Sequence, residues 1–361
     1  MITPKILIIG STGILGLKII KYLNDLNVPI ETATCFNNLK LLKKLKVKFN
    51  IKRTFCLNQN KSNDYSVLLN HVRENKYDII YILDTELNSI PLIQSSLKFQ
   101  KNCVYATANK ELVIAGGKIL INLINKNNIF LPLDSEHFSL IDITNYEIDK
   151  IKKVYITASG GPFYFTKKKL KNVKLKEVIK HPKWKMGKDI CINSSNFINK
   201  AFEILELSTI FGIPLNKIDI LLSKEALVHS VVSFTDGRYT FNIFNNDMLI
   251  PLIKPLEKFN LPTKINNKID LSLYKNFKLA YPKNDIRFPL LKKIKLIKTF
   301  NHCQQILFLI LNKKAHNLYL SDKLRYNQIV NYIFSNMSNY NYKYNLLNLD
   351  DIIKYYKKCS E

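Results

Sequence analysis

An acidic segment follows an apolar run of the chain and carries two carboxylates two residues apart: Asp134, Ser135, Glu136 and His137. Carboxylates at this spacing can converge on one hard cation, and oxygen ligands suit Mg²⁺ or Mn²⁺ better than Zn²⁺. The same residue types also suit a helix start, with Asp134 or Ser135 as N-cap and Glu136 in the first turn. Taken alone, the segment favours neither interpretation.

A polar stripe runs along a helix predicted at 194–211. Ser195, Asn199 and Glu203 follow one another at intervals of four residues among apolar neighbours, and Lys200 adds a cation. The stripe could supply a third carboxylate to a metal. An exposed Lys200–Glu203 pair, worth a few tenths of a kcal/mol, is the better interpretation of this helix in isolation.

A glycine-rich turn, Gly10-Ser-Thr-Gly-Ile-Leu-Gly16, lies between a predicted strand and a predicted helix. Such glycines allow a tight turn and let the backbone approach a pyrophosphate at the helix N-terminus. The turn therefore predicts dinucleotide binding. The second strand ends in Cys35-Phe-Asn-Asn38, without the carboxylate that binds the ribose in NAD enzymes, so NADPH is permitted.

Two further segments combine glycine with polar or aromatic residues. Ser-Gly-Gly-Pro at 159–162 ends a predicted strand, and it suits either a phosphate-facing backbone or an ordinary Gly-Pro turn. The segment His181–Gly187 contains the single Trp of the chain and one of its four Met residues. Its Pro and Gly indicate a loop, which could act as a lid over a site.

The elements that must position these residues alternate over the first 130 residues. We expect strands at 5–9, 30–34, 48–56, 78–83 and 103–107, and helices at 14–26, 39–45, 65–74, 91–99 and 110–125. Strands and helices that alternate in this way form a parallel sheet covered on both faces.

The rest of the chain changes pattern. A strand at 154–158 and a hairpin of 227–234 with 239–244 around Asp236-Gly237 predict a mixed sheet. Helices are expected at 303–312, 323–334 and 350–358. The predicted fold is α/β: a Rossmann-like domain (1–150), a mixed catalytic domain (151–281) with a flap near 181–187, a linker (282–297) and a small C-terminal helical domain (298–361).

The composition excludes some classes of function. A formal charge of +27 invites a nucleic-acid interpretation, but five of the 55 basic residues are Arg and the Lys residues are scattered. Because Arg is favoured for phosphate and base recognition, and A/T-rich coding explains the abundance of Lys, nucleic-acid binding is not expected. The six cysteines show no CxxC, apolar runs are too short to span a membrane, and the first strand begins near Met1. We expect a cytoplasmic bacterial protein.

Six motifs in order resemble a known enzyme family. They are Gly-Ser-Thr-Gly-x-x-Gly (10–16), Ala-Asn-Lys-Glu-Leu-Val (108–113), Leu-Pro-x-Asp-Ser-Glu-His (131–137), Ser-Gly-Gly-Pro-Phe (159–163), His-Pro-x-Trp-x-Met-Gly (181–187) and Asn-Lys-x-x-Glu (199–203). Together they are similar to the motifs of 1-deoxy-D-xylulose 5-phosphate reductoisomerases, which serve the non-mevalonate route to isoprenoids. The resemblance covers essentially the whole chain and is weaker between the motifs and in the C-terminal helices.

The resemblance implies a role for each matching residue. The metal ligands would be Asp134, Glu136 and Glu203. The substrate and its phosphate would contact Lys110, Ser135, Ser159, Ser194, Asn199 and Lys200, and His181 would close over them from a flap that also carries Trp184 and Met186. The residues along NADPH would be Thr12, Gly13, Ile14, Leu15, Asn38, Asn109, Glu111 and Gly187.

The implied reaction is a rearrangement of 1-deoxy-D-xylulose 5-phosphate followed by its reduction to 2-C-methyl-D-erythritol 4-phosphate. A divalent cation would hold the carbonyl and hydroxyl oxygens of the phosphosugar, and NADPH would deliver hydride. Mg²⁺ or Mn²⁺ is expected, and Co²⁺ is also compatible. The family precedent implies a homodimer.

The chain departs from the family pattern at four places. Ala201 stands where the family usually has Gly, and Ser223-Lys-Glu-Ala226 replaces a His-Pro-Gln-Ser run. The segment 36–38 lacks the cation expected at the 2′-phosphate, so a weaker preference for NADPH is predicted. The segment from Asn312 ends in His316 instead of Glu.

Two rival classes of function share part of this pattern. A homoserine or semialdehyde dehydrogenase would have the glycine-rich turn without the acidic cluster, and its activity would resist a chelator. A remnant kept as a binding protein would explain the departures, but every proposed ligand and phosphate contact retains its chemistry.

Overall fold

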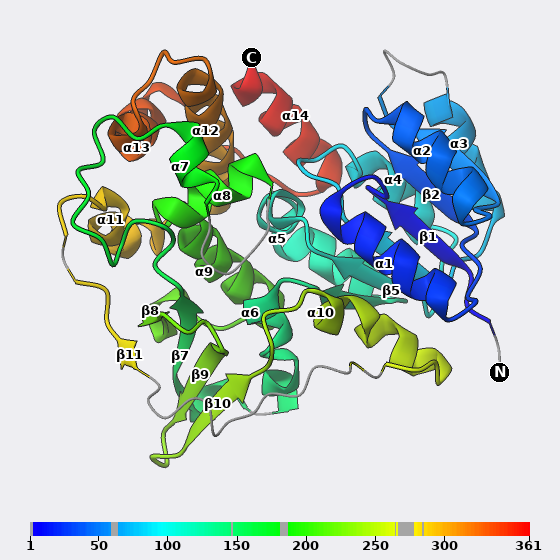
Figure 1. Cartoon of the computed structure of the whole chain (residues 1–361), viewed down its shortest axis with the longest axis horizontal. Coiled ribbons are helices and arrows are strands. Elements are labelled where there is room, and N and C mark those ends of the chain that lie inside the picture. The colour runs from blue at the N-terminus through cyan, green and yellow to red at the C-terminus, as the bar shows by residue number, and fades with distance from the viewer. Residues whose placement is uncertain are drawn as a thin grey trace. The chain divides into compact units, whose positions relative to one another are not determined.

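The computed structural model describes residues 3–58, 64–145, 147–180, 187–263, 265, 278–283 and 285–361 (Figure 1). These residues form two compact units. Unit 1 takes its residues from 1–138 and 247–268, and unit 2 takes its residues from 139–246 and 269–361. Within the described ranges, no helix combines the length and the apolar character that crossing a membrane requires.

Unit 1 is built on a parallel sheet of six strands. In chain order they are β1 (Ile6–Ile9), β2 (Thr32–Cys35), β3 (Arg53–Cys56), β4 (Ile79–Ile82), β5 (Val104–Thr107) and β6 (Ile129–Pro132). Their order in the sheet is β3-β2-β1-β4-β5-β6, and all neighbours are parallel. This is the strand order of dinucleotide-binding folds, in which ligands bind beside the carboxyl ends of the strands where the order reverses.

Amphipathic helices connect these strands and bury them. They are α1 (Ile14–Asp25), α2 (Leu39–Lys48), α3 (Asp64–Glu74), α4 (Ile90–Leu97) and α5 (Lys110–Asn125). Every residue of β1, β2, β4 and β5 is buried, as expected for a parallel sheet covered on both faces. The predicted strand–helix alternation is confirmed. The strand predicted at 48–56 is shorter, because Lys48 completes α2 and β3 begins at Arg53.

A later segment of the chain completes the core of unit 1. α10 (Leu249–Ile253) and the 3₁₀ turn η4 (Lys254–Phe259) place Leu252, Ile253 and Leu256 in the hydrophobic cluster formed with the sheet. The buried Tyr81 hydroxyl donates to the Leu252 carbonyl at 2.9 Å. This segment therefore belongs with the parallel sheet, although the sequence assigned it to the second domain.

Unit 2 contains the mixed sheet that the sequence predicted. Its strands are β7 (Ile151–Ala158), β8 (Ile218–Ser223), β9 (Val228–Phe234), β10 (Tyr239–Ile243) and β11 (Leu279–Ala280), in the order β10-β9-β7-β8-β11. β7 and β8 are parallel, and the other pairs are antiparallel. The expected hairpin joins β9 to β10, with Gly237 at φ +91° in its turn.

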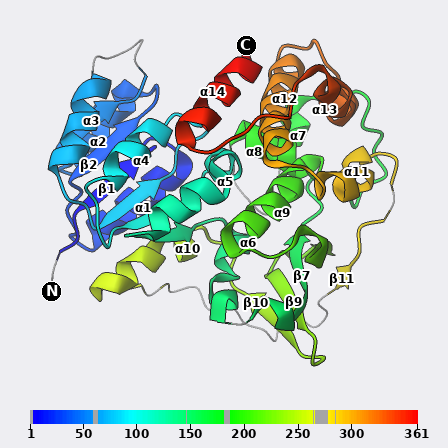
Figure 2. The same cartoon turned by 180° about the vertical axis from the view of Figure 1, so that it is seen from behind.

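Helices make up the remainder of unit 2. They are α7 (Leu175–Val178), α8 (Lys188–Ser195), α9 (Ile198–Phe211), α11 (Pro289–Ile297), α12 (His302–Leu320), α13 (Ile329–Asn336) and α14 (Leu349–Ser360). Short 3₁₀ turns lie at η1 (Ile141–Asn145), η2 (Ile148–Lys150), η3 (Leu215–Lys217), η6 (Tyr326–Gln328) and η7 (Met337–Asn339). Seen from behind in Figure 2, the C-terminal helices α12 and α13 lie near α7 and α8.

Three sequence expectations about helices differ from this outcome. The helix predicted at 194–211 is confirmed over Ile198–Phe211, but its predicted start is wrong, because Phe197 adopts a left-handed conformation (φ 69°) and separates α8 from α9. The segment expected as a linker at 282–297 contains α11. The helix expected at 303–312 continues to Leu320, since its apolar face extends to Ala315 and Tyr319.

Candidate active site

The acidic segment begins where β6 ends. Asp134 stands just before the short helix α6 (Ser135–Phe138), and its Oδ1 accepts from the Glu136 N–H at 3.2 Å. The Ser135 hydroxyl donates to the Glu136 carboxylate. His137 is fully buried, with its Nδ1 3.4 Å from Asp134 Oδ1. Asp134 therefore caps α6 through Oδ1, as one of the two interpretations predicts, and the metal role of these carboxylates stays a prediction.

The neighbouring strand brings a cation to this carboxylate. β5 pairs with β6 so that Thr107 lies opposite Pro132. Because the strands are parallel, the residues that follow them meet at one edge of the sheet. Lys110, the first residue of α5, donates to Asp134 Oδ2 there. The Asn109 side chain caps α5 by accepting from the Leu112 N–H at 2.9 Å, which fixes the start of the helix.

Glu203 lies in unit 2, on the buried face of α9. It is 1% exposed, and it accepts from the Asn199 amide on one oxygen and from the Lys200 ammonium on the other. The sequence alternative of an exposed Lys200–Glu203 pair is wrong, because both side chains are buried. A buried carboxylate needs compensating charge or hydrogen bonds, and two predicted substrate contacts supply them here.

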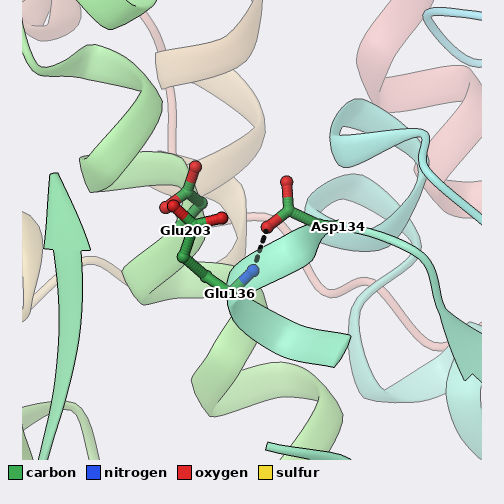
Figure 3. A group of neighbouring side chains, drawn as sticks. All are labelled: Asp134, Glu136 and Glu203. Carbon is green, nitrogen blue, oxygen red and sulfur yellow. Dashed lines mark hydrogen bonds between the residues drawn. The ribbon is translucent and has the colours of Figure 1, made fainter. Parts of the chain in front are cut away.

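Asp134, Glu136 and Glu203 are the three acidic side chains drawn in Figure 3, which also marks the hydrogen bond between Asp134 and Glu136. Each can offer one carboxylate oxygen to a metal ion. Three carboxylates are a donor set for a hard divalent cation, and their chemistry fits Mg²⁺ or Mn²⁺.

The glycine loop after β7 lies against the last turn of α8. Gly160 and Gly161 have φ of +82° and +58°, and a Cβ at Gly161 would stand 3.1 Å from the Ser194 carbonyl oxygen. The loop that carries Ser159 therefore meets the turn that carries Ser194 through Gly161.

A cavity of about 760 Å³ opens beside Ser159, within unit 2. Its lining includes Lys224 and Glu225 of the run in which this chain departs from the family pattern, and the Lys224 ammonium lies 5.8 Å from the centre of the Phe165 ring. Lys180 lines the same cavity. From the sequence, Lys224 was noted only as part of the run that departs from the family pattern, and Lys180 was not noted. That departure was the signal for Lys224.

The glycine turn of unit 1 has the geometry expected of a dinucleotide site. Gly13 is the N-cap of α1, and a Cβ on Gly16 would stand 2.5 Å from the Gly10 carbonyl oxygen. Gly10 has φ +85°, and a Cβ there would stand 2.6 Å from the backbone N of Asp84. Thr12, Ile14 and Leu15 are not buried, and Ile14 is 54% exposed at the start of the helix. The turn leaves its backbone open to a ligand.

The second segment predicted to bind the cofactor caps a helix. The Asn38 side chain caps α2 by accepting from the Leu41 N–H at 3.1 Å. Asn37 accepts from the Asn58 amide at 2.6 Å. Glu111 lies in the first turn of α5, and Gly187 is the N-cap of α8. His181, Trp184 and Met186 of the predicted flap lie outside the described residues.

The strand order and the glycine turn of unit 1 define an α/β dinucleotide-binding protein, and its second unit carries a buried carboxylate held by polar side chains. Residues 130–211 match the family model of the 1-deoxy-D-xylulose 5-phosphate reductoisomerase C-terminal domain. The chain is 32% identical to the 1-deoxy-D-xylulose 5-phosphate reductoisomerase of Pelagibacter ubique, over 91% of this chain and 89% of the relative. The chain is also 32% identical to the 1-deoxy-D-xylulose 5-phosphate reductoisomerase of Thermoanaerobacter pseudethanolicus, over 99% of this chain and 97% of the relative. The chain belongs to the 1-deoxy-D-xylulose 5-phosphate reductoisomerase family.

Solved structures share the fold along the whole chain. The reductoisomerase from Zymomonas mobilis in complex with NADPH superposes with a TM-score of 0.84 at 22% identity, covering 99% of this chain and 97% of that one. A reductoisomerase in complex with NADPH, fosmidomycin and magnesium gives a TM-score of 0.84 at 24% identity, covering 99% and 96%. The family resemblance inferred from the six motifs is thus confirmed, while the role of each residue stays a prediction.

Proposed function

We propose that this chain converts 1-deoxy-D-xylulose 5-phosphate to 2-C-methyl-D-erythritol 4-phosphate, with NADPH and a divalent cation. Family membership over most of the chain supports the reaction. The observation that carries the proposal is the acidic set, in which two carboxylates follow β6 and a third is buried on α9 among polar partners. A dehydrogenase that uses only the dinucleotide has no need of such a set.

We assign the cation to Asp134, Glu136 and Glu203. Each of these carboxylates already has a partner that fixes its orientation: Lys110 at Asp134, Ser135 at Glu136, and Asn199 with Lys200 at Glu203. Partners of this kind hold metal ligands in the conformation that binds the ion and are costly to remove.

We assign the substrate phosphate to Ser159, Ser194, Asn199 and Lys200. The positive φ at Gly160 and Gly161 turns the backbone after β7, and the loop meets Ser194. Hydroxyl, amide and ammonium groups are suitable donors for a phosphate. NADPH is assigned to the Gly10–Gly16 turn and to Asn38, Asn109 and Glu111.

When bound, the cation supplies a Lewis acid for the substrate oxygens, and NADPH supplies a hydride. The residues of this chain orient and stabilise. Lys110, held at the carboxyl edge of the sheet, adds positive charge where oxyanion charge develops. Ser135 and Asn199 contribute hydrogen bonds to substrate oxygens, and the phosphate contacts fix the position of the sugar chain.

The decisive experiment follows NADPH oxidation with 1-deoxy-D-xylulose 5-phosphate, with and without Mn²⁺. The wild type should turn over only with the metal. Glu203→Gln keeps the size of the side chain and removes its charge, so kcat/KM should fall by about 100-fold or more. Glu257→Gln is the matched control, because Glu257 forms an exposed pair with Lys254 in unit 1. No metal-dependent turnover by the wild type would refute the proposed function.

A second measurement tests the ligand assignment without catalysis. Mn²⁺ binding, followed by the loss of its free electron paramagnetic resonance signal, should weaken in Glu203→Gln and stay unchanged in Glu257→Gln. Equal Mn²⁺ affinity in the wild type and in Glu203→Gln would remove Glu203 from the ligand set.

We also propose that the protein works as a homodimer in the bacterial cytoplasm without binding nucleic acid. The scattered lysines and the A/T-rich coding pattern support the last point. Light scattering should report twice the monomer mass. A monomer mass, or retention by duplex DNA at 150 mM salt, would contradict this proposal.

A further inference from the structure

Helix α8 is held at both ends by the C-terminal helical region. In its first turn, Asp189 Oδ1 lies 2.8 Å from His316 Nδ1 on α12, and Asp189 Oδ2 lies 3.3 Å from the Lys313 ammonium. In its last turn, Ser195 accepts from the buried Tyr326 hydroxyl at 2.8 Å. The anchors lie more than 100 residues beyond α8 in the chain, so they tie α8 to elements that are distant in sequence.

The first anchor joins a buried ring to a half-exposed carboxylate. His316 is 1% exposed, whereas the Asp189 side chain is 47% exposed. The hydrogen bond from His316 lowers the pKa of Asp189 to about 2, so this carboxylate stays ionised. The Nε2 atom of His316 is buried and has no hydrogen-bond partner among the described residues. The Nδ1 bond to Asp189 therefore fixes the orientation of the ring.

Predicted substrate contacts lie on α8 and on the helix that follows it. Ser194 lies on α8 next to the anchored Ser195, with the Gly161 backbone packed against it. α9 begins three residues after Ser195 and carries Asn199, Lys200 and Glu203. α12 supports α9 too, through the Phe202 and Phe308 rings, whose centres lie 5.1 Å apart. α12 thus supports both α8 and α9, the two helices that carry these predicted substrate contacts.

We propose that Asp189 and His316 form a positioning pair that sets α8, and with it Ser194, for the substrate phosphate. This inference rests on the proposed function, because Ser194 receives its role there. It also explains one departure from the family pattern. A glutamate at position 316 would set a second carboxylate against Asp189, so the histidine and the aspartate belong together in this chain.

Steady-state kinetics with 1-deoxy-D-xylulose 5-phosphate tests the pair. Asp189→Asn changes a half-exposed side chain and should fold. Loss of a charged hydrogen bond predicts a rise in KM of roughly ten-fold with kcat within about two-fold. His316→Glu should raise KM further, because the new carboxylate repels Asp189. Adding Asp189→Lys to this variant should bring KM much of the way back to the wild-type value. Asp236→Asn, which breaks the exposed pair with Arg238 on the β9–β10 hairpin, is the matched control and should leave KM unchanged.

Amide hydrogen exchange of α8 gives a readout that does not need turnover. Exchange of the α8 amides should be about ten-fold faster in Asp189→Asn than in the wild type or Asp236→Asn, and it should slow again in the doubly charge-reversed variant. An unchanged KM in Asp189→Asn, or unchanged α8 exchange, would overturn the inference. Absent turnover in the wild type would instead count against the proposed function, and the exchange comparison would still decide the role of the pair.

Discussion

Asp84 offers the sharpest test of the energetics of unit 1. It lies just past β4, where its Oδ1 accepts from the Ser89 hydroxyl and from the Asn109 amide, each at 3.2 Å. Its Oδ2 is buried without a hydrogen-bond partner among the described residues. Its backbone N packs against Gly10. Burial raises the pKa of Asp84 from 3.8 to about 7.

This pKa sets the sign and the size of a pH effect on stability. The folded-state pKa lies above the unfolded one, so the folded state binds the proton more tightly. The stabilisation is fully present below about pH 4 and is lost as the pH rises through about 7. At about 1.4 kcal/mol per pKa unit, the rise in the pKa of Asp84 from 3.8 to about 7 corresponds to at most about 4 kcal/mol in the free energy of unfolding.

Asp84→Asn tests this reasoning because the amide cannot ionise and keeps an acceptor for Ser89 and Asn109. Urea unfolding, followed by circular dichroism between pH 4 and 8, should show the variant gaining stability relative to the wild type as the pH rises. Most of the gain should come below pH 7. Asp25→Asn, at the exposed end of α1, is the control and should show no such trend. A difference between Asp84→Asn and the wild type that stays constant across this range would refute the reasoning.

Three further predictions follow from the geometry. Gly10→Ala should lower NADPH affinity and the unfolding temperature, because its Cβ would meet the Asp84 backbone at 2.6 Å in a left-handed conformation; unchanged melting with and without NADPH would contradict this. Lys224→Met should raise KM for the phosphorylated substrate by roughly three-fold to ten-fold, because the lost cation lines the cavity beside Ser159; an unchanged KM would exclude Lys224 from substrate binding. The ratio of kcat/KM for NADPH over NADH should be low for this family, because Asn38 caps α2 and no cation stands at 36–38; strong selectivity for NADPH would disprove it.

Local patterns in the sequence predicted most of the framework. Burial on both faces of a parallel sheet needs continuous apolar strands, and amphipathic helices leave a clear period, so β1 to β5 and α1 to α5 could be predicted from residue order alone. The glycine turn could be predicted because close backbone approach leaves few alternatives to glycine. The resemblance of six ordered motifs then identified the family, which the comparisons confirm.

The sequence misjudged features that depend on distant partners. The break at Phe197 was missed because its left-handed conformation is held by packing against Tyr164 and Phe288, which lie far away in the chain. The linker predicted at 282–297 is different, because α11 begins at Pro289 and proline suits the first turn of a helix, so a local signal for this helix was present. At Phe197, contacts between elements overrode the local signal.

The residue types alone determined which chemistry was available: glycines for a pyrophosphate, carboxylates for a hard cation, and hydroxyls with an ammonium for a phosphate. The tertiary structure decided which partners and which burial each of these side chains has. Asp134 proved to cap α6 and to bind Lys110 as well, and Glu203 proved to be buried among polar partners instead of exposed. The tertiary structure also brought His316 into hydrogen-bond contact with Asp189. Such outcomes depend on burial and on neighbours brought from other strands and helices, and neither is set by local sequence spacing.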